Sequence, residues 1–378
     1  VLDPDRPGLI VAGPWRGRPQ AWPGFVVALR QLQRRTGWPL LADALSGLRG
    51  IPGLELVAGY DLLLSRPQPT LSCAQILRLG PLPASRRLQT FLAGSSARQL
   101  LISEGEPRSL DALQCATGQQ SCGLEAWWRQ RSPGWQQGAL AREASVFASH
   151  WQQADGRLQR RLDADLTGGA GLEGGCSAAP FNEPALARHL SRVLPPGLPV
   201  VLANSSPVRD WESFMPADAP WRPVISFRGA SGIDGTLSLA CGVAQAAGAA
   251  VLISGDLALL HDANGWLWRR QLTGRLAVLL LDNGGGGIFE QLPIRPQTPQ
   301  LLDFERLFAM PQAVDPLALA AAHGVPGRQS AGWTALEGDL DWALEQPLAL
   351  VRLCTDRRLD AGRRQALRTM GAPVSPPP

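Results

Sequence analysis

The strongest hydrophobic pattern in the chain is a pair of unbroken apolar runs that both end abruptly in small and oxygen-bearing residues. The first run ends at Gly255 and Asp256, and the second ends at Asp282 and Asn283, just before four glycines. Such runs are typical of strands buried on both faces of a parallel sheet. Between them, Leu257–Arg270 carries apolar residues at helical spacing, which predicts a strand–helix–strand unit. A right-handed crossover would bring Asp256 and Asn283 side by side at the carboxyl ends of neighbouring strands, where parallel sheets bind ligands.

Similar patterns along the rest of the chain predict an α/β fold with two doubly wound, mainly parallel-sheet domains. We expect the first domain at residues 1–165 and the second at 181–370. Residues 166–180 are rich in glycine and are predicted to be a flexible linker, and the proline-rich residues 371–378 are predicted to be disordered. Four tryptophans in a helical region of the first domain are interpreted as core residues: Trp127, Trp128, Trp135 and Trp151.

The individual elements follow from the same patterns. Strands are predicted at residues 8–13, 39–42, 74–80, 98–103, 199–203, 223–227 and 348–353, besides the two apolar runs. Helices are predicted at residues 24–36, 183–193, 235–247, 317–323 and 333–344, in addition to the one between the two runs.

Composition narrows the possible functions. The formal net charge is +4 and all 36 basic residues are arginines, but no arginine stripe with interleaved aromatic residues is present, so we expect no nucleic-acid partner. Some arginines are interpreted as ligands of small anionic substrates, because the guanidinium fork binds carboxylates.

The six cysteines show no metal-site spacing, which indicates a reducing cytoplasm. No membrane span or secretory signal is expected. A chain that begins with Val1 rather than Met is expected to be a fragment.

The residues at the ends of the two apolar runs offer oxygen ligands to a hard cation. Asp256 supplies a carboxylate, Asn283 supplies an amide oxygen, and the glycines that follow leave their backbone carbonyls unshielded. Mg²⁺ binds such oxygens in octahedral geometry and often shares them with a substrate phosphate. From composition alone, a flexible glycine loop beside a strand-capping Asp256 explains the pattern equally well.

Three stretches carry a resemblance to a known family: Asn204–Asp210, Phe227–Gly235 and Asp282–Phe289. Together with Asp256 and Asn283, which lie 27 positions apart, they resemble the thiamine diphosphate (ThDP) enzyme superfamily. Within it, the arginine, glycine and isoleucine positions of the middle stretch are similar to the 2-succinyl-5-enolpyruvyl-6-hydroxy-3-cyclohexene-1-carboxylate (SEPHCHC) synthases, the MenD family. The resemblance implies a central domain followed by a ThDP diphosphate-binding domain.

The resemblance also implies an activity. Enzymes of this family are ThDP-dependent transferases that use Mg²⁺ or Mn²⁺. They decarboxylate 2-oxoglutarate and add the resulting succinyl carbanion equivalent to isochorismate, which gives SEPHCHC in menaquinone or phylloquinone biosynthesis. The implied protein is a cytoplasmic homodimer or homotetramer with its active sites between subunits.

The resemblance implies a role for each residue of this sequence that matches a site position of the family. The metal ligands would be Asp256, Asn283 and the backbone oxygen of Gly285. The remaining implied residues fall into three groups. Cofactor contacts would come from Asn204, Gly255, Leu257 and Ile288. The catalytic residues would be Ile233, which wedges under the cofactor, and Ser205, Arg209 and Arg228. Substrates would be held by Arg209 and Arg228 for 2-oxoglutarate, by Arg86 and Arg87 for isochorismate, and by Phe289 at the cavity wall.

The sequence departs from the family at two points. Asp282 stands where the family has Asn, and Gly284 follows Asn283, but neither position is a ligand in the family pattern. More important, no stretch matches the pyrimidine-binding domain, whose glutamate contacts the aminopyrimidine ring, so the resemblance covers about the last two-thirds of the family's length. We therefore expect the isolated chain to bind ThDP weakly and to turn over nothing.

Three alternatives remain open. The first is another ThDP-dependent 2-oxoacid decarboxylase or carboligase. Such enzymes usually carry Gly-Asp-Gly, with a glycine at the position of Leu257, and they lack Arg228 together with Ile233. An inactive fragment could serve as a binding module. A metal-dependent phosphatase would need further carboxylates near Asp256, for which only Asp234 and Asp262 are candidates.

Overall fold

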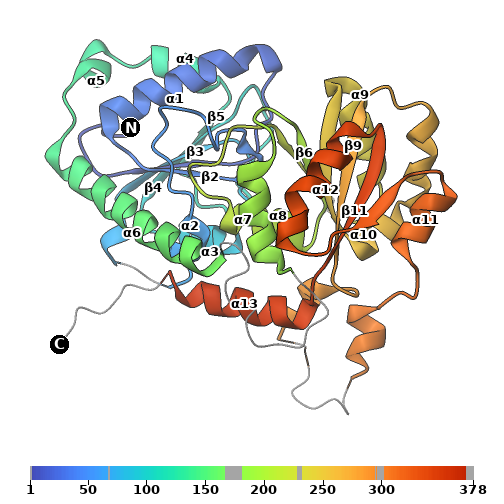
Figure 1. The fold of residues 1–378 in the computed structure, drawn as a ribbon. Coiled ribbons are helices and arrows are strands. Elements are labelled where there is room, and N and C mark those ends of the chain that lie inside the picture. The colour runs from blue at the N-terminus through green and yellow to red at the C-terminus, as the bar shows by residue number, and fades with distance from the viewer. Residues whose placement is uncertain are drawn as a thin grey trace. The chain divides into compact units, whose positions relative to one another are not determined.

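A computed structural model describes residues 2–66, 69–166, 181–227, 232–293, 295 and 302–371. The chain divides into two compact units (Figure 1). The first comprises the residues up to Arg161, together with Pro216–Trp221 and the residues from Arg368 on. The second comprises Leu162–Met215 and Arg222–Leu367. The predicted linker at 166–180 and the predicted tail at 371–378 lie, except for Leu166 and Gly371, outside the described residues.

The first unit contains a five-stranded, all-parallel sheet in the order β2-β1-β3-β4-β5. Its strands are β1 (Leu9–Ala12), β2 (Leu40–Ala42), β3 (Gln75–Leu79), β4 (Arg98–Ile102) and β5 (Gly118–Gln120). The first four were predicted. The edge strand β5 was not, because its largely exposed sequence has no apolar run.

The helices of the first unit are mostly short. They are α1 (Trp22–Thr36), α2 (Tyr60–Leu63), α3 (Arg86–Gly94), α4 (Leu124–Arg129), α5 (Pro133–Gln137) and most of α6 (Arg142–Leu166), with 3₁₀ turns η1 (Pro19–Ala21), η2 (Ala44–Ser46) and η3 (Pro69–Leu71). The core interpretation of the tryptophans is confirmed for Trp127, Trp128 and Trp151, which are buried. Trp135 is half-buried and packs edge-on against Trp127 and Trp128.

The second unit contains a six-stranded, all-parallel sheet in the order β10-β11-β9-β8-β6-β7. Its strands are β6 (Val200–Leu202), β7 (Val224–Ile225), β8 (Ala249–Gly255), β9 (Arg275–Asp282), β10 (Gly327–Gln329) and β11 (Leu348–Cys354). The chain leaves β6 toward β7 at one edge and returns to β8 on the other side of β6. The carboxyl ends of β6 and β8 therefore flank a topological switch point, where open parallel sheets bind ligands.

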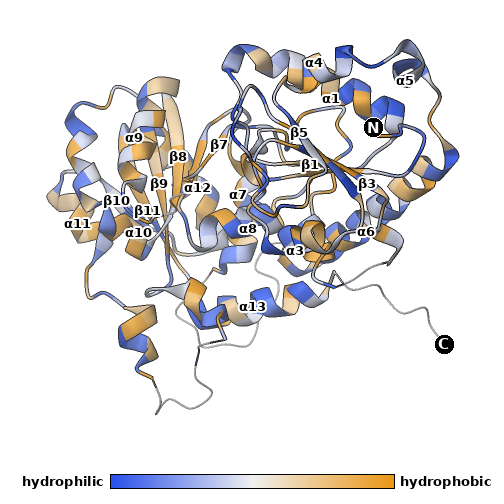
Figure 2. Ribbon diagram, turned by 180° about the vertical axis from the view of Figure 1, so that it is seen from behind, coloured by the Kyte–Doolittle hydropathy of each residue, from blue (hydrophilic) through white to orange (hydrophobic). Residues whose placement is uncertain are grey.

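The two long apolar runs form β8 and β9, as predicted, and pair in parallel from Ala249 with Arg275 to Gly255 with Leu281. Their apolar character is visible in Figure 2. Side chains of β9 alternate between two packed faces. Val278 joins a core with Leu237 and Ala244 of α9 (Thr236–Ala247), and α12 (Trp333–Glu345) also packs against β9. Burial on both faces explains why these runs contain no polar alternation.

The remaining helical elements of the second unit complete its layers. They are α7 (Glu183–Val193), α8 (Ser206–Phe214), α10 (Asp256–His261), α11 (Pro316–Ala322) and α13 (Arg357–Thr369), with 3₁₀ segments η4 (Ala263–Arg270) and η5 (Gly287–Gln291) and a π-helical turn η6 (Glu305–Ala309). Among the described residues, no helix is long and apolar enough to cross a membrane.

The helical crossover predicted at Leu257–Arg270 is confirmed, but it is not one continuous helix, because the structure divides it into α10 and η4 at Asp262. The Asp262 carboxylate accepts hydrogen bonds from the backbone N–H and the hydroxyl of Ser238, at 2.6 and 3.1 Å. Gly265 then lies so close to Leu237 that a Cβ atom there would be 2.8 Å from Leu237 Cγ. Tertiary contacts with α9 thus override the helical periodicity.

Candidate functional site

The main candidate site is a pocket within the second unit, at the carboxyl ends of β6, β8 and β9. Its cavity volume is about 290 Å³. Two of these strand ends, those of β6 and β8, flank the topological switch point, and the glycine-rich loop after β9 closes one side. Eleven residues expected at the site from the sequence line this pocket: Asn204, Ser205, Arg209, Ile233, Gly255, Asp256, Leu257, Asn283, Gly285, Ile288 and Phe289.

Asp256 joins the end of β8 to the glycine loop. It is the first residue of α10, and its Oδ1 accepts the N–H of Leu257 at 2.7 Å. Its Oδ2 accepts the N–H of Gly285 at 2.6 Å. Burial, reinforced by the nearby charges of Asp282 and Glu183, raises the pKa of Asp256 to about 7. A carboxylate with this environment is electrostatically suited to receive a cation.

Two amide oxygens in the pocket have no hydrogen-bond partner among the described residues: Asn283 Oδ1 and Asn204 Oδ1. Each amide nitrogen is engaged, since Asn283 Nδ2 donates to Glu183 Oε1 and Asn204 Nδ2 donates to the carbonyl of Gly232, both at 2.5 Å. Buried polar atoms are nearly always satisfied in native proteins. Unsatisfied acceptors that line one pocket with Asp256 therefore fit a bound cation or hydrogen-bond donor.

The glycine loop after β9 requires glycine at specific positions. Gly285 has φ +127°, and a Cβ atom there would be 2.1 Å from the carbonyl oxygen of Ala309. A Cβ atom at Gly286 would be 2.3 Å from the carbonyl of Phe308, while the N–H of Gly286 donates to Ala309 O at 2.6 Å. The loop thus packs backbone against backbone on η6. The interpretation of Gly284–Gly287 as merely a flexible loop is wrong, because these contacts determine its conformation.

Ser205 and Arg209 lie at the other side of the pocket, where β6 leads into α8. Ser205 has φ +75°, a positive value that is rare for a residue with a side chain. Arg209 donates to the Ser205 carbonyl at 2.6 Å, one helical turn away, and its side chain is exposed. Backbone strain of this kind persists where the surrounding structure demands it, often at binding sites.

The three other arginines expected at the site have different positions. Arg228 lies outside the described residues. Arg86 and Arg87 begin α3 in the first unit, where Arg87 forms an ion pair with the buried Asp61 and Arg86 is exposed. Asp61 also accepts the hydroxyl of Ser85, the residue that caps α3, at 2.5 Å. Arg87 is therefore tied to its own domain.

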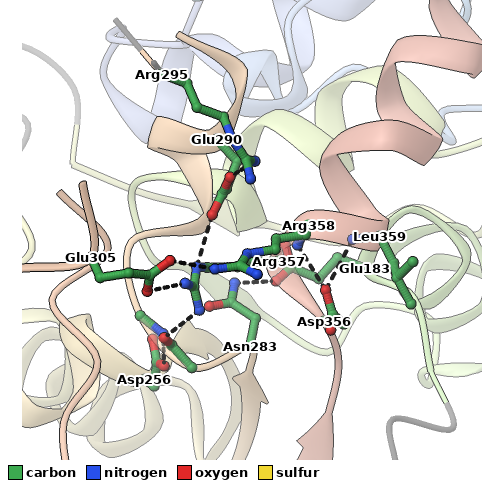
Figure 3. Close-up of polar contacts among 12 residues, drawn as sticks. Glu183, Asp256, Asn283, Glu290, Arg295, Glu305, Asp356, Arg357, Arg358 and Leu359 are labelled. Atoms are coloured by element: carbon green, nitrogen blue, oxygen red, sulfur yellow. Dashed lines mark hydrogen bonds and ion pairs between the residues drawn. The ribbon is translucent and has the colours of Figure 1, made fainter. Parts of the chain in front are cut away.

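Glu183 is the main pocket residue that sequence reasoning missed. It is the first residue of α7, and the preceding Asn182 caps that helix by accepting the N–H of Ala185 at 2.9 Å. An acidic residue in a first helical turn is ordinary in sequence terms. Its contact with Asn283, one hundred positions away, is created only by the fold (Figure 3).

A second feature visible in Figure 3 is an arginine that holds the glycine loop from outside. Arg357, at the start of α13, donates to the carbonyl of Gly284 at 3.2 Å and to Glu290 at 2.9 Å, and it also pairs with Glu305. Its neighbour Arg358 contacts Glu305 at 2.5 Å. Arg357 thus ties the loop, η5 and η6 to one another.

The other acidic residues considered from the sequence do not face this pocket. Asp282 pairs with Arg352 at 2.7 Å, Asp262 is bound to Ser238, and neither these residues nor Asp234 are among the described pocket-lining residues. The described residues contain no group of three His, Cys, Asp or Glu side chains that could hold a metal ion.

The five described cysteines are free. Cys241 is buried, whereas Cys354 is half-buried because it lies at the end of β11. Burial raises the pKa of the Cys241 thiol to about 11, which makes it unreactive.

Fold and pocket together define an α/β protein with an oxygen-rich ligand site at the carboxyl edge of a parallel sheet. No protein-family model matches the chain. It is 55% identical over 373 residues to the 2-succinyl-5-enolpyruvyl-6-hydroxy-3-cyclohexene-1-carboxylate synthase of Synechococcus sp. (strain RCC307), with 97% of this chain and 61% of the relative covered. It is 50% identical to the synthases of the same name from Synechococcus sp. (strain CC9311), with 97% and 63% covered, and from Parasynechococcus marenigrum (strain WH8102), with 99% and 64% covered.

The chain is therefore a homologue of the SEPHCHC synthases over nearly its whole length. It spans less than two-thirds of the length of these relatives. The family resemblance inferred from the three sequence stretches is confirmed.

Proposed function

We propose that this chain contributes to a ThDP- and metal-dependent transferase that decarboxylates 2-oxoglutarate and transfers the succinyl unit to isochorismate, forming SEPHCHC for menaquinone or phylloquinone biosynthesis. The observation that carries the proposal is the pocket at the ends of β6, β8 and β9. It combines Asp256 with the unsatisfied oxygen of Asn283, in a chain that is homologous to synthases of that name.

The donor set fits a divalent metal bound to a diphosphate. Asp256 offers one half-buried carboxylate and Asn283 offers an amide oxygen that has no partner among the described residues. We assign the backbone oxygen of Gly285 as the third protein ligand. Mg²⁺ and Mn²⁺ accept such oxygen sets and complete their shells with phosphate oxygens or water. A single protein carboxylate suits a site whose remaining negative charge comes from the diphosphate.

Bound ThDP would supply the electron sink for decarboxylating a 2-oxo acid, and the protein would supply position and electrostatics. Gly255, Leu257 and Ile288 would contact the cofactor beside the metal ligands. Ile233, a branched apolar side chain in the pocket wall, would hold the cofactor in a bent conformation. Apolar contacts here would also exclude water from the reacting centre.

Substrate carboxylates would be held by arginines. Arg209 lines the pocket, and we assign it, with Arg228, Asn204 and Ser205, to 2-oxoglutarate. We assign Arg86 and Arg87 to isochorismate and Phe289 to the cavity wall near the reacting ring. Guanidinium groups bind carboxylates through paired, charge-assisted hydrogen bonds. The working enzyme is proposed to be a cytoplasmic homo-oligomer with its sites between subunits.

The proposal is tested with a hybrid in which this chain replaces the matching residues of the Synechococcus RCC307 synthase. With ThDP and Mg²⁺, the hybrid should consume 2-oxoglutarate and form SEPHCHC from isochorismate, detected by mass spectrometry. Substituting Arg209→Met should raise the KM for 2-oxoglutarate by about 10-fold or more, because a charge-assisted contact is lost. A hybrid that binds ThDP but prefers pyruvate would instead identify a different 2-oxoacid decarboxylase.

A further inference from the structure

Glu183 occupies a buried position from which it contacts three elements distant in sequence. Its side chain is 1% exposed. Its Oε1 accepts the side-chain N–H of Asn283, at the end of β9, at 2.5 Å and the hydroxyl of Thr355 at 3.4 Å. Its Oε2 pairs with Arg364 of α13. Figure 3 shows Glu183 and Asn283 facing each other.

The chemistry of this contact determines which end of the Asn283 amide faces the pocket. A carboxylate only accepts hydrogen bonds, whereas an amide has a donating NH₂ group and an accepting oxygen. Glu183 therefore selects the orientation in which Asn283 Nδ2 points toward it. The opposite atom, Oδ1, then belongs to the pocket side, where it is buried and has no partner among the described residues.

Arg364 in turn holds Glu183. Its guanidinium donates from Nε to Asp210 Oδ1 at 2.8 Å and from Nη2 to Asp210 Oδ2 at 2.5 Å, while Nη2 also pairs with Glu183. A third buried carboxylate, Asp360, accepts the backbone N–H of Glu183 at 3.1 Å. Burial, with the Glu183 charge adding to it, raises the pKa of Asp360 well above its ordinary value. The positive charge of Arg364 is thus left to balance the negative charges of Glu183 and Asp210.

We propose that Glu183 is a positioning residue that fixes the Asn283 amide with its oxygen toward the pocket, so that this oxygen can serve as a metal ligand. The inference rests on the proposed function, since it assumes that the pocket binds a metal. It adds a role for a residue that is not proposed to bind either the metal or the substrate. Its action is entirely through the orientation of Asn283.

The substitution Glu183→Gln tests this role because it replaces one accepting carboxylate oxygen with a donating NH₂ group and keeps the size of the side chain. Arg364 can only donate, so the single acceptor of a glutamine must face Arg364. The glutamine NH₂ then faces Asn283, whose amide must turn and present its own NH₂ to the pocket. We expect Mn²⁺ affinity, measured by electron paramagnetic resonance with ThDP present, to fall about 10–100-fold, the usual effect of losing a residue that orients a ligand.

A reciprocal exchange separates orientation from general damage. In the double variant Glu183→Gln with Asn283→Asp, the glutamine NH₂ donates to the new carboxylate, whose second oxygen faces the pocket, and the total charge is unchanged. Mn²⁺ affinity should return to within about threefold of the unsubstituted chain. Glu212→Gln is the matched control, because Glu212 is also buried in the second unit but is not among the described pocket-lining residues, and it should leave Mn²⁺ affinity unchanged.

A metal-free readout covers the case in which a variant does not fold. In the nuclear magnetic resonance spectrum of the unsubstituted, ¹⁵N-labelled chain, the hydrogens of the Asn283 side-chain NH₂ should exchange slowly with solvent, because Glu183 shields them. The signal is identified by its absence from the spectrum of Asn283→Asp. The inference is overturned if that NH₂ exchanges at the solvent rate, if Glu183→Gln binds Mn²⁺ as tightly as the unsubstituted chain, or if the double variant binds no better than Glu183→Gln. If the hybrid of this chain with the Synechococcus RCC307 synthase retains no Mn²⁺ in the presence of ThDP while the Asn283 NH₂ is protected, the proposed function fails and the orientation stands.

Discussion

The Asp256 carboxylate accepts the backbone N–H of Gly285 at 2.6 Å, which joins the end of β8 to the glycine loop that follows β9. The two strands are neighbours in register from Ala249 with Arg275 to Gly255 with Leu281. Two chain segments separated by a whole crossover therefore meet at one point on the sheet edge. This contact is the physical basis for assigning a ligand site to the pocket.

The glycine loop should tolerate no side chain at Gly285. Gly285→Ala places a Cβ within 2.1 Å of the Ala309 carbonyl at a φ of +127°, so we expect the free energy of unfolding to fall by about 2–4 kcal/mol. Urea unfolding measures the change. Gly338→Ala is the control, since a Cβ there meets nothing within 4 Å in the exposed part of α12. It should stabilise by about 0.5–1 kcal/mol, and equal effects of the two substitutions would contradict this account of the loop.

Arg357 should matter for ligand binding more than its neighbour Arg358. Arg357 contacts the Gly284 carbonyl, Glu290 and Glu305, whereas Arg358 is 58% exposed and contacts Glu305. We expect Arg357→Gln to weaken ThDP binding in the presence of Mn²⁺ about 10-fold, because the loop loses its outer support. Arg358→Gln should change it less than twofold. Isothermal titration calorimetry compares the two variants, and similar losses in both would show that the loop does not depend on Arg357.

Much of this architecture could be predicted from the sequence, and the limits have physical causes. The runs that became β8 and β9 are identifiable because burial on both faces leaves only apolar residues. The break at Asp262 and the position of Glu183 in the pocket could not be predicted, because both depend on contacts with residues distant in sequence, Ser238 and Asn283. Local periodicity carries no information about such partners.

Stability of the metal-free chain should depend on pH through Asp256. Its pKa is raised from an ordinary 3.8 to about 7, mainly by burial. A raised folded-state pKa gives a stabilising contribution that is complete below about pH 4 and is lost as the pH rises through 7. The difference corresponds to roughly 4 kcal/mol. Thermal unfolding between pH 4.5 and 8 should therefore show a decline that is smaller in Asp256→Asn.

The metal should reverse this dependence. Mn²⁺ bound with ThDP would replace the proton on Asp256. The stabilisation that Mn²⁺ and ThDP give should therefore increase from pH 5 to 7 and then level off. An identical pH profile for Asp256→Asn and the unsubstituted chain, with or without Mn²⁺, would show that Asp256 does not titrate in this range.

The most direct test of the metal–diphosphate site is the ThDP-dependent retention of Mn²⁺, measured by electron paramagnetic resonance. In the hybrid in which this chain replaces the matching residues of the Synechococcus RCC307 synthase, we expect Mn²⁺ to be retained when ThDP is present, and Asp256→Ala to weaken that retention by more than about 100-fold, because the only proposed carboxylate ligand is lost. Asp341→Ala, which removes an exposed aspartate of α12 in the same unit, should have no effect. Equal, ThDP-dependent Mn²⁺ retention by the Asp256→Ala variant and the unsubstituted hybrid would contradict the assignment.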